Sequence, residues 1–263
     1  FGADLQSSAR RIGVRGAALS FIDVCLLYGD TAETIYPVSR SGRFMEVKPS
    51  PETPLPEVSP RWRQACAHID NAAELREILI GAAGEFGDFS TAELGAVIDG
   101  QDFTGDAVAE LEASLRAAEG TGPLTPAAAV GAAFRGVFQE CVDWHKVHGP
   151  MPGFRELSRT LERVAFGPPP VTARRLLELI HSGVVNTDYL GAPEQIDSWR
   201  EKGGVDLLID ATVAPQATPS PFHDVAGVVE IGRMNELSLP GHDSLNRSVH
   251  DDIPRWAEKV GNP

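Results

Sequence analysis

The sequence has few cysteines and no closely spaced pair of them. Its 263 residues include three cysteines, Cys25, Cys66 and Cys141, each set among apolar neighbours. The absence of a Cys-x-x-Cys pair excludes a redox-active disulfide of the thioredoxin-reductase type and the usual spacing of a structural zinc site. An odd number of widely spaced cysteines is typical of buried thiols in a reducing compartment, so we expect a cytoplasmic protein.

Long apolar runs and blocks of positive charge are also missing. No apolar stretch reaches the roughly 20 residues of a membrane-spanning helix, and no signal peptide opens the chain, so we expect no membrane partner. The formal net charge is -14, and the acidic residues are spread along the chain, which disfavours binding to a nucleic-acid backbone. The composition, 42% hydrophobic and 23% charged, is that of a globular protein with a core.

The first forty residues predict a strand–helix–strand unit. Residues 11–15 read as a short strand, residues 17–27 as an apolar helix and residues 34–39 as a second strand. Residues 48–60 hold five prolines, and we expect an extended connector there because proline lacks the backbone N–H that a helix or a central strand requires. Residues 1–58 therefore form an α/β part.

Helical signals dominate residues 59–202. Ser90 and Glu93 form a capping box ahead of an apolar stripe, and Thr125 followed by Pro126 begins the longest predicted helix. We expect an all-helical insert of roughly five to seven helices, given typical helix lengths.

Strand signals return in residues 203–263. The nearly continuous apolar run at 205–211 is typical of a parallel strand that is covered on both faces. A further strand at 227–232 and a terminal helix at 248–260 would complete this part. The fold class that we predict is α/β, with a Rossmann-like parallel sheet interrupted by a large all-helical insert.

The junction between the first strand and the first helix is a candidate nucleotide-binding turn. Unpaired backbone N–H groups and the positive end of a helix dipole attract a pyrophosphate at such a junction. Aligned on the G-x-G-x-x-G pattern, residues 16–21 supply Gly16 at the first position, Ala18 at the second and Phe21 at the third. The motif is degenerate, and a strand–glycine–helix junction without a ligand explains it as easily.

The segment after the second strand favours NADP as the cofactor, with NAD second. In this fold an acidic residue at that place selects NAD, whereas a basic residue accepts the 2′-phosphate of NADP. The segment contains Ser39, Arg40, Ser41 and Arg43 and no acid, and a guanidinium offers a planar fork of donors to a phosphate. The alternative interpretation is a loop that carries surface arginines.

These segments resemble the bacterial FAD/NAD(P)-binding protein family, distant relatives of flavin monooxygenases and of lysine and ornithine N-hydroxylases. The resemblance rests on residues 12–23, 38–43, 167–170, 206–212 and 241–247. It implies an oxidoreductase in which a nicotinamide passes hydride to a flavin. The positions that match the nucleotide contacts of the family are Gly16, Ala18, Ser20, Arg40, Arg43 and, at the end of a later strand, Thr212.

The family carries a flavin domain ahead of the nicotinamide segment. This chain shows no glycine-rich turn for a flavin and does not begin with Met, so we expect a fragment whose FAD is bound through a domain upstream. Asp243, in the Gly-His-Asp segment at 241–243, matches a family position near the flavin. A plain turn rich in Gly, Asp and Ser is the other interpretation of that segment.

Other groups of polar residues carry less information. His145 and His148 share a face near the end of the longest predicted helix, but no third strong ligand lies nearby, so we predict no metal site. Ser20 lacks the G-x-S-x-G elbow of a hydrolase. The sequence identifies no catalytic acid or base.

Two functions follow from the sequence. The first is the nicotinamide-nucleotide-binding portion of an FAD- and NAD(P)H-dependent oxidoreductase that acts on a small-molecule substrate. The second is a non-catalytic binding or scaffold module that keeps the fold with a degenerate site. The second is motivated by Ala18, Phe21 and Val213, which stand where the family prefers glycine and would crowd the backbone.

Overall fold

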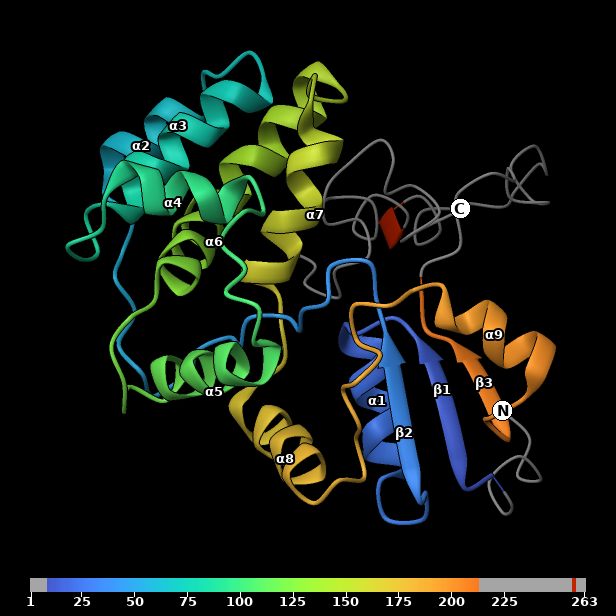
Figure 1. Cartoon of the computed structure of the whole chain (residues 1–263). Helices are drawn as coiled ribbons and strands as arrows, with labels where there is room; N and C mark the ends of the chain where they lie inside the picture. The colour runs from blue at the N-terminus through green and yellow to red at the C-terminus, as the bar shows by residue number, and fades with distance from the viewer. Residues whose placement is uncertain (1–8, 213–256, 259–263) are drawn as a thin grey trace.

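A computed structural model of the chain describes residues 9–212 and 257–258 (Figure 1). Within these residues, three parallel strands form one sheet, and nine helices lie around it or in a separate body. The prediction of a mixed α/β protein with a parallel sheet is confirmed. The predicted strand at 227–232 and most of the predicted helix at 248–260 lie outside the described residues.

The sheet has the order β2-β1-β3. Strand β1 spans Arg11–Arg15, β2 spans Thr34–Val38 and β3 spans Leu207–Asp210, and β1 pairs with both neighbours in parallel. Helix α1, Leu19–Tyr28, connects β1 to β2. The strand–helix–strand unit is therefore present as predicted. The apolar run at 205–211 contains β3, which pairs with β1 on the side opposite β2.

The two faces of β1 are covered by different elements. Ile12 and Val14 are fully buried and belong to the same core as α1. Gly13 points to the other face, where a Cβ atom would lie 2.7 Å from the ring of Trp199. Trp199 is carried by α9, Gln195–Lys202, so this helix can pack closely on the sheet because residue 13 has no side chain.

The segment at residues 184–190, which ends in a turn, lines the outer edge of β2. The backbone N–H of Ile35 donates to the Val184 carbonyl at 2.7 Å, and the Asn186 N–H donates back to Ile35 at 3.0 Å. Further along, the Ser39 N–H donates to the Leu190 carbonyl at 2.7 Å. These bonds satisfy backbone groups that an open sheet edge would leave to solvent.

Five helices form a body beside the sheet (Figure 1). They are α2 (Pro60–Cys66), α3 (Ala72–Ala83), α4 (Thr91–Ile98), α6 (Pro126–His148) and α7 (Phe154–Ala165). Their shared core includes Leu75, Leu79, Leu94, Val130, Phe134 and Leu161. The long α6 contacts each of the other four, so it is the centre of this body.

The remaining helices of the predicted insert pack with the sheet. Helices α5 (Ala107–Ala118) and α8 (Pro170–His181) share a core with β1 and α1, which includes Leu115 and Leu176. Residues 59–202 thus contain eight helices, α2 to α9, more than the five to seven that we predicted. The predicted insert is structurally divided, because α9 packs on β1, α8 packs on α1 and α5 packs on α8.

The local signals in the sequence agree with the structure. Ser90 and Glu93 form the capping box of α4, and the Thr125 side chain caps α6. Residues 48–59 contain neither helix nor strand, as the prolines predict. Within the described ranges, no helix has the length and apolar character that crossing a membrane would require.

Candidate functional site

The carboxyl ends of the three strands meet the first turn of α1. We call residues 15–20, 39–41 and 210–212 the carboxyl edge. The Gly16 N–H donates to the Val38 carbonyl at 2.7 Å, and the Ala211 N–H donates to the Arg15 carbonyl at 2.8 Å. These bonds hold the turn after β1 between the ends of β2 and β3. Ligands of open α/β sheets bind at this end of the strands.

Gly16 is required by the backbone of the turn. Its φ is +116°, a conformation that residues with a side chain rarely adopt. A Cβ atom at this position would also lie 3.1 Å from the carbonyl oxygen of Ala211. The fold therefore demands a glycine here whether or not a ligand binds.

The N-terminus of α1 is open. Ala18 is the N-cap residue with no side-chain hydrogen bond, and the first turn contains no acidic residue. Among the described residues, the N–H groups of Leu19 and Ser20 have no hydrogen-bond partner. Both Ala18 and Ser20 are exposed. The positive end of the helix dipole thus faces the carboxyl edge, and no acidic side chain of the first turn neutralises it.

Phe21 does not obstruct this turn. Its side chain is fully buried and stacks on Phe44, with the ring centroids 6.1 Å apart. The bulky residue at the third glycine position therefore points into the core between α1 and the segment that follows β2. Of the three substitutions that motivate a scaffold function, Phe21 leaves the backbone accessible, Ala18 lies at the open turn and Val213 lies outside the described residues.

Ser39 and Arg40 have different surroundings at the end of β2. The Ser39 hydroxyl accepts from the Gly42 N–H at 3.1 Å and donates to the Leu190 carbonyl at 3.4 Å, so it shapes the turn. Arg40 is exposed and forms no hydrogen bond or ion pair with the rest of the described chain.

Arg43 is engaged inside the protein. Its side chain is 7% exposed, Nη2 donates to Asp102 at 2.8 Å and Nε donates to Glu110 at 3.0 Å. The guanidinium also lies over the ring of Phe103. Burial lowers the pKa of Arg43, but the two carboxylates outweigh burial and raise it above its ordinary value. Arg43 therefore joins the segment after β2 to α5 and to the loop before it.

Sequence reasoning missed the partners of Arg43. Asp102 and Glu110 lie 59 and 67 residues further along the chain, so no local spacing connects them. Arg163 also approaches this group, with Nη2 3.6 Å from Oδ1 of Asp102. The one relevant feature of the sequence is that residues 39–43 contain no acid. This feature agrees equally well with a buried arginine that pairs elsewhere and with a phosphate site.

The end of β3 completes the carboxyl edge. Asp210 accepts hydrogen bonds from the N–H and the hydroxyl of Thr212, and Arg15 lies 3.5 Å from its carboxylate. The Thr212 hydroxyl is the main cause of a lowered pKa at Asp210, with Arg15 contributing less. Gly16 and Thr212 are thus brought to the same edge as the sequence predicts. Asp243 lies outside the described residues.

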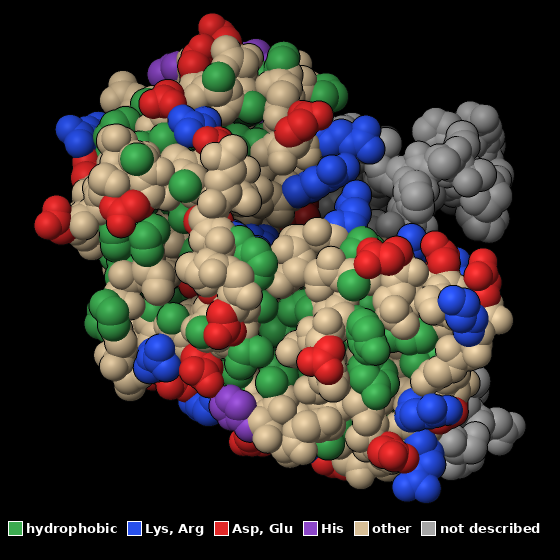
Figure 2. Space-filling view, viewed as in Figure 1, with side chains coloured by type: hydrophobic (Ala, Val, Ile, Leu, Met, Phe, Trp, Pro, Cys, Tyr) green, Lys and Arg blue, Asp and Glu red, His purple; other side chains and the backbone are tan. Residues whose placement is uncertain are grey.

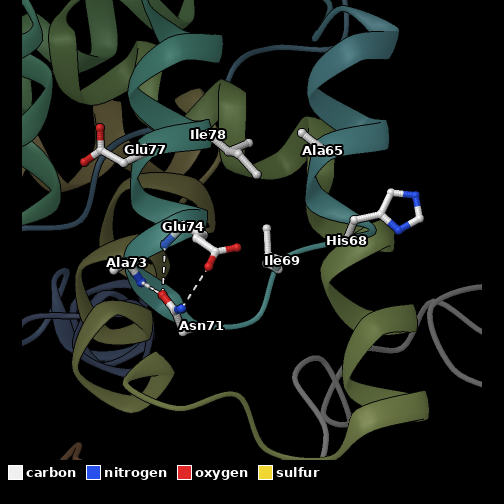
Figure 3. A pocket seen from close by; sticks show the side chains of 8 residues that line it. All are labelled: Ala65, His68, Ile69, Asn71, Ala73, Glu74, Glu77 and Ile78. Carbon is white, nitrogen blue, oxygen red and sulfur yellow. Dashed lines mark hydrogen bonds between the residues drawn. The ribbon is translucent and has the colours of Figure 1, made fainter.

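An open groove between α2 and α3 is an alternative site (Figure 3). It is lined by Ala65, His68, Ile69, Asn71, Ala73, Glu74, Glu77 and Ile78. Asn71 caps α3, and the Glu74 carboxylate accepts from the Asn71 side chain and from the Asp70 N–H. The imidazole of His68 points away from the groove in Figure 3. These polar groups therefore serve the helix cap.

The histidine pair of α6 has structural contacts. His145 is buried, and a ring nitrogen bonds the Cys141 carbonyl at 2.8 Å. Burial lowers the pKa of His145. His148 stacks on Trp144 with the ring centroids 4.6 Å apart. Among the residues that the structure describes, no three His, Cys, Asp or Glu side chains gather in a metal-binding arrangement.

Comparison with known proteins gives no family. No protein-family model matches the chain, and no curated protein matches it. The function has to be inferred from the geometry and charge of the carboxyl edge.

Proposed function

We propose that the chain binds NADP(H) at the carboxyl edge of a Rossmann-like sheet, as the nicotinamide-nucleotide-binding portion of an FAD- and NAD(P)H-dependent oxidoreductase. One observation carries the proposal: the uncapped N-terminus of α1 lies at the same edge as Arg40, which is exposed and has no partner among the described residues. A dinucleotide has a pyrophosphate for the first and, in NADP, a 2′-phosphate for the second.

The charges at this edge support an anionic ligand. The charges of Arg15 and Asp210 offset one another. The remaining positive charge at the edge comes from Arg40 and from the N-terminus of α1, whose dipole is equivalent to roughly half a positive charge. The whole chain has a net charge of -14, which makes a locally positive edge a selective place for an anion. The backbone N–H groups of Leu19 and Ser20 would hold the pyrophosphate, and Arg40 would hold the 2′-phosphate.

The reaction proposed for the whole protein belongs to its cofactors. Bound NADPH supplies hydride for a flavin, and FAD would be held by a domain upstream of these residues. The residues of this chain would fix the position of the nucleotide through Gly16, the first turn of α1 and Arg40. The substrate would be a small molecule. The resemblance of residues 12–23 and 38–43 to the FAD/NAD(P)-binding family supports the same assignment.

Calorimetric titration with NADPH and NADH tests the proposal. We expect NADPH to bind more tightly, and Arg40→Gln to remove the preference by weakening NADPH roughly 10- to 100-fold, the value of one or two charge-assisted hydrogen bonds. Arg63→Gln is the matched control, because Arg63 is also exposed but lies on α2 in the helical body. An unchanged preference in Arg40→Gln would refute the assignment of Arg40.

A binding or scaffold module is the second candidate function. It is favoured by Ala18 in place of the second glycine and by Gly16, which the fold requires without any ligand. If neither NADPH nor NADH binds to the chain, even with a flavin domain present, the oxidoreductase proposal fails and this candidate replaces it.

A further inference from the structure

Helix α7 presents a line of arginines. Arg155, Arg159 and Arg163 follow one another at four-residue intervals, which places them along one side of the helix. Arg155 and Arg159 are exposed, and neither guanidinium forms an ion pair or hydrogen bond with the described part of the chain. Figure 2 shows Lys and Arg side chains gathered beside α7, on the side of the helical body that faces the ends of the strands.

This arrangement is unusual for the protein. Most other surface arginines lie within 4 Å of a carboxylate, and these are Arg10, Arg11, Arg15, Arg61, Arg76, Arg116, Arg174, Arg175 and Arg200. Two like charges one turn apart destabilise a helix slightly. In a chain with a net charge of -14, two neighbouring arginines that have no acidic partner among residues 9–212 and 257–258 therefore favour an external anion as their partner.

Arg163 lies at the buried end of this line of arginines. Arg163 is 14% exposed, and its Nη2 atom is buried without a hydrogen-bond partner among the described residues. Burial is the main cause of a lowered pKa at Arg163, and the charge of Arg43 adds to it. Two acidic groups at this junction, Asp102 and Glu110, bind Arg43, and the third, the buried Glu46, acts on the charge of Arg163 and accepts a hydrogen bond from Thr125. The arginines of α7 therefore extend outward from a place where the local carboxylates are occupied.

Arg163, at the C-terminal end of the line, lies beside the segment that follows β2 and carries Arg40. The Glu46 N–H donates to the Arg163 carbonyl at 2.9 Å, and Arg163 and Arg43 share the carboxylate of Asp102. Arg40 lies three residues before Arg43. The chain after β2 thus runs from the carboxyl edge to the C-terminal end of α7, where Arg163 lies, and Arg159 and Arg155 follow one and two turns further along the helix. In a Rossmann-like sheet, the adenosine ribose lies at the end of this strand.

We propose that Arg155 and Arg159 form, together with Arg40, the binding site for the 2′-phosphate of NADP(H). This inference rests on the proposed function and deepens it, because the helical body would then supply part of the nucleotide site. A phosphate dianion accepts several guanidinium hydrogen bonds, so residues from two elements can hold it at once.

The test compares 2′,5′-ADP with 5′-ADP, which differ by the 2′-phosphate alone. Calorimetry is carried out on the full chain, on the double variant Arg155→Gln/Arg159→Gln, on Arg40→Gln and on the control Arg63→Gln. We expect the double variant to lose roughly tenfold or more of its affinity for 2′,5′-ADP and to keep its affinity for 5′-ADP. Arg63→Gln should bind both ligands as the unmodified chain does.

Each other outcome has a distinct meaning. If the double variant binds 2′,5′-ADP normally while Arg40→Gln does not, the inference about α7 is overturned and the proposed function stands. If the unmodified chain does not distinguish the two ligands, both are overturned. An equal loss for both ligands, or the same loss in Arg63→Gln, would show a general electrostatic effect and would overturn the 2′-phosphate assignment. Because both arginines are exposed, unchanged thermal unfolding of the double variant checks that it folds.

Discussion

Replacing Arg43 by alanine separates a structural role of this residue from a role in nucleotide binding. The guanidinium donates to both oxygens of Asp102 and to Glu110, and these carboxylates are 15% and 22% exposed. The substitution would leave two mostly buried acids without their main partner. Breaking a buried ion pair in this way costs about 3–5 kcal/mol.

The surroundings place the expected loss at the lower end of that range. Arg163 stays 3.6 Å from Asp102 and partly replaces the missing charge. We therefore expect Arg43→Ala to lower the free energy of unfolding by about 3 kcal/mol, a large part of the ~5–15 kcal/mol of an ordinary domain. Arg43→Lys should lose less, because it keeps the charge but not the paired hydrogen bonds to Asp102.

Urea denaturation followed by tryptophan fluorescence measures this loss, and NADPH titration under native conditions measures binding. We expect the folded fraction of Arg43→Ala to bind NADPH with an unchanged affinity. A loss of stability below about 1 kcal/mol, the level of an exposed ion pair, would refute the structural role. So would a large loss of NADPH affinity in a variant of normal stability.

Three further substitutions test other features of the fold. Gly16→Ala should lower stability by about 1–2 kcal/mol because of the positive φ, more if the contact with Ala211 cannot relax, which thermal unfolding would show. Gly13→Ala places a methyl group against Trp199 and should cost about 1–3 kcal/mol and change the tryptophan fluorescence; an unshifted melting temperature would contradict the packing of α9. Burial is the main cause of a raised pKa at Glu46, so its contribution to stability is greatest below the ordinary glutamate range and is lost as the pH rises through the raised value. Glu46→Gln should therefore flatten the decline in melting temperature as the pH rises above the ordinary glutamate range, and a parallel decline in both proteins would argue against Glu46 as its cause.

The sequence predicts the elements that local patterns encode. β1, α1 and β2 have their apolar residues at the right period, and Thr125 and Pro126 mark the start of α6 by cap chemistry. The number of helices was underestimated because α2 and α9 are short, with seven and eight residues. Periodicity alone gives weak signals over two turns.

Contacts between elements that are distant in the sequence could not be predicted from these local patterns. Helices α5 and α8 have amphipathic sequences like those of the helical body, and only the packing of Leu115 and Leu176 assigns them to the core of the sheet. The segment 184–190 pairs with β2 through backbone hydrogen bonds. Such bonds do not depend on side-chain identity, so the sequence pattern could not predict them. Arg43 could not be distinguished from Arg40 because its partners lie far along the chain.

The glycine motif has a different meaning once the turn is seen in three dimensions. Gly16 is explained by a positive φ and by the approach of Ala211, so its presence is no independent sign of a ligand. Phe21 points into the core, so its bulk is no argument against a ligand either. For the nucleotide site that we propose, the feature that differs from a bare strand–helix junction is charge. The uncapped N-terminus of α1 and the guanidinium of Arg40, which has no partner among the described residues, would attract anions, and a scaffold that had lost its ligand would have no need to keep both.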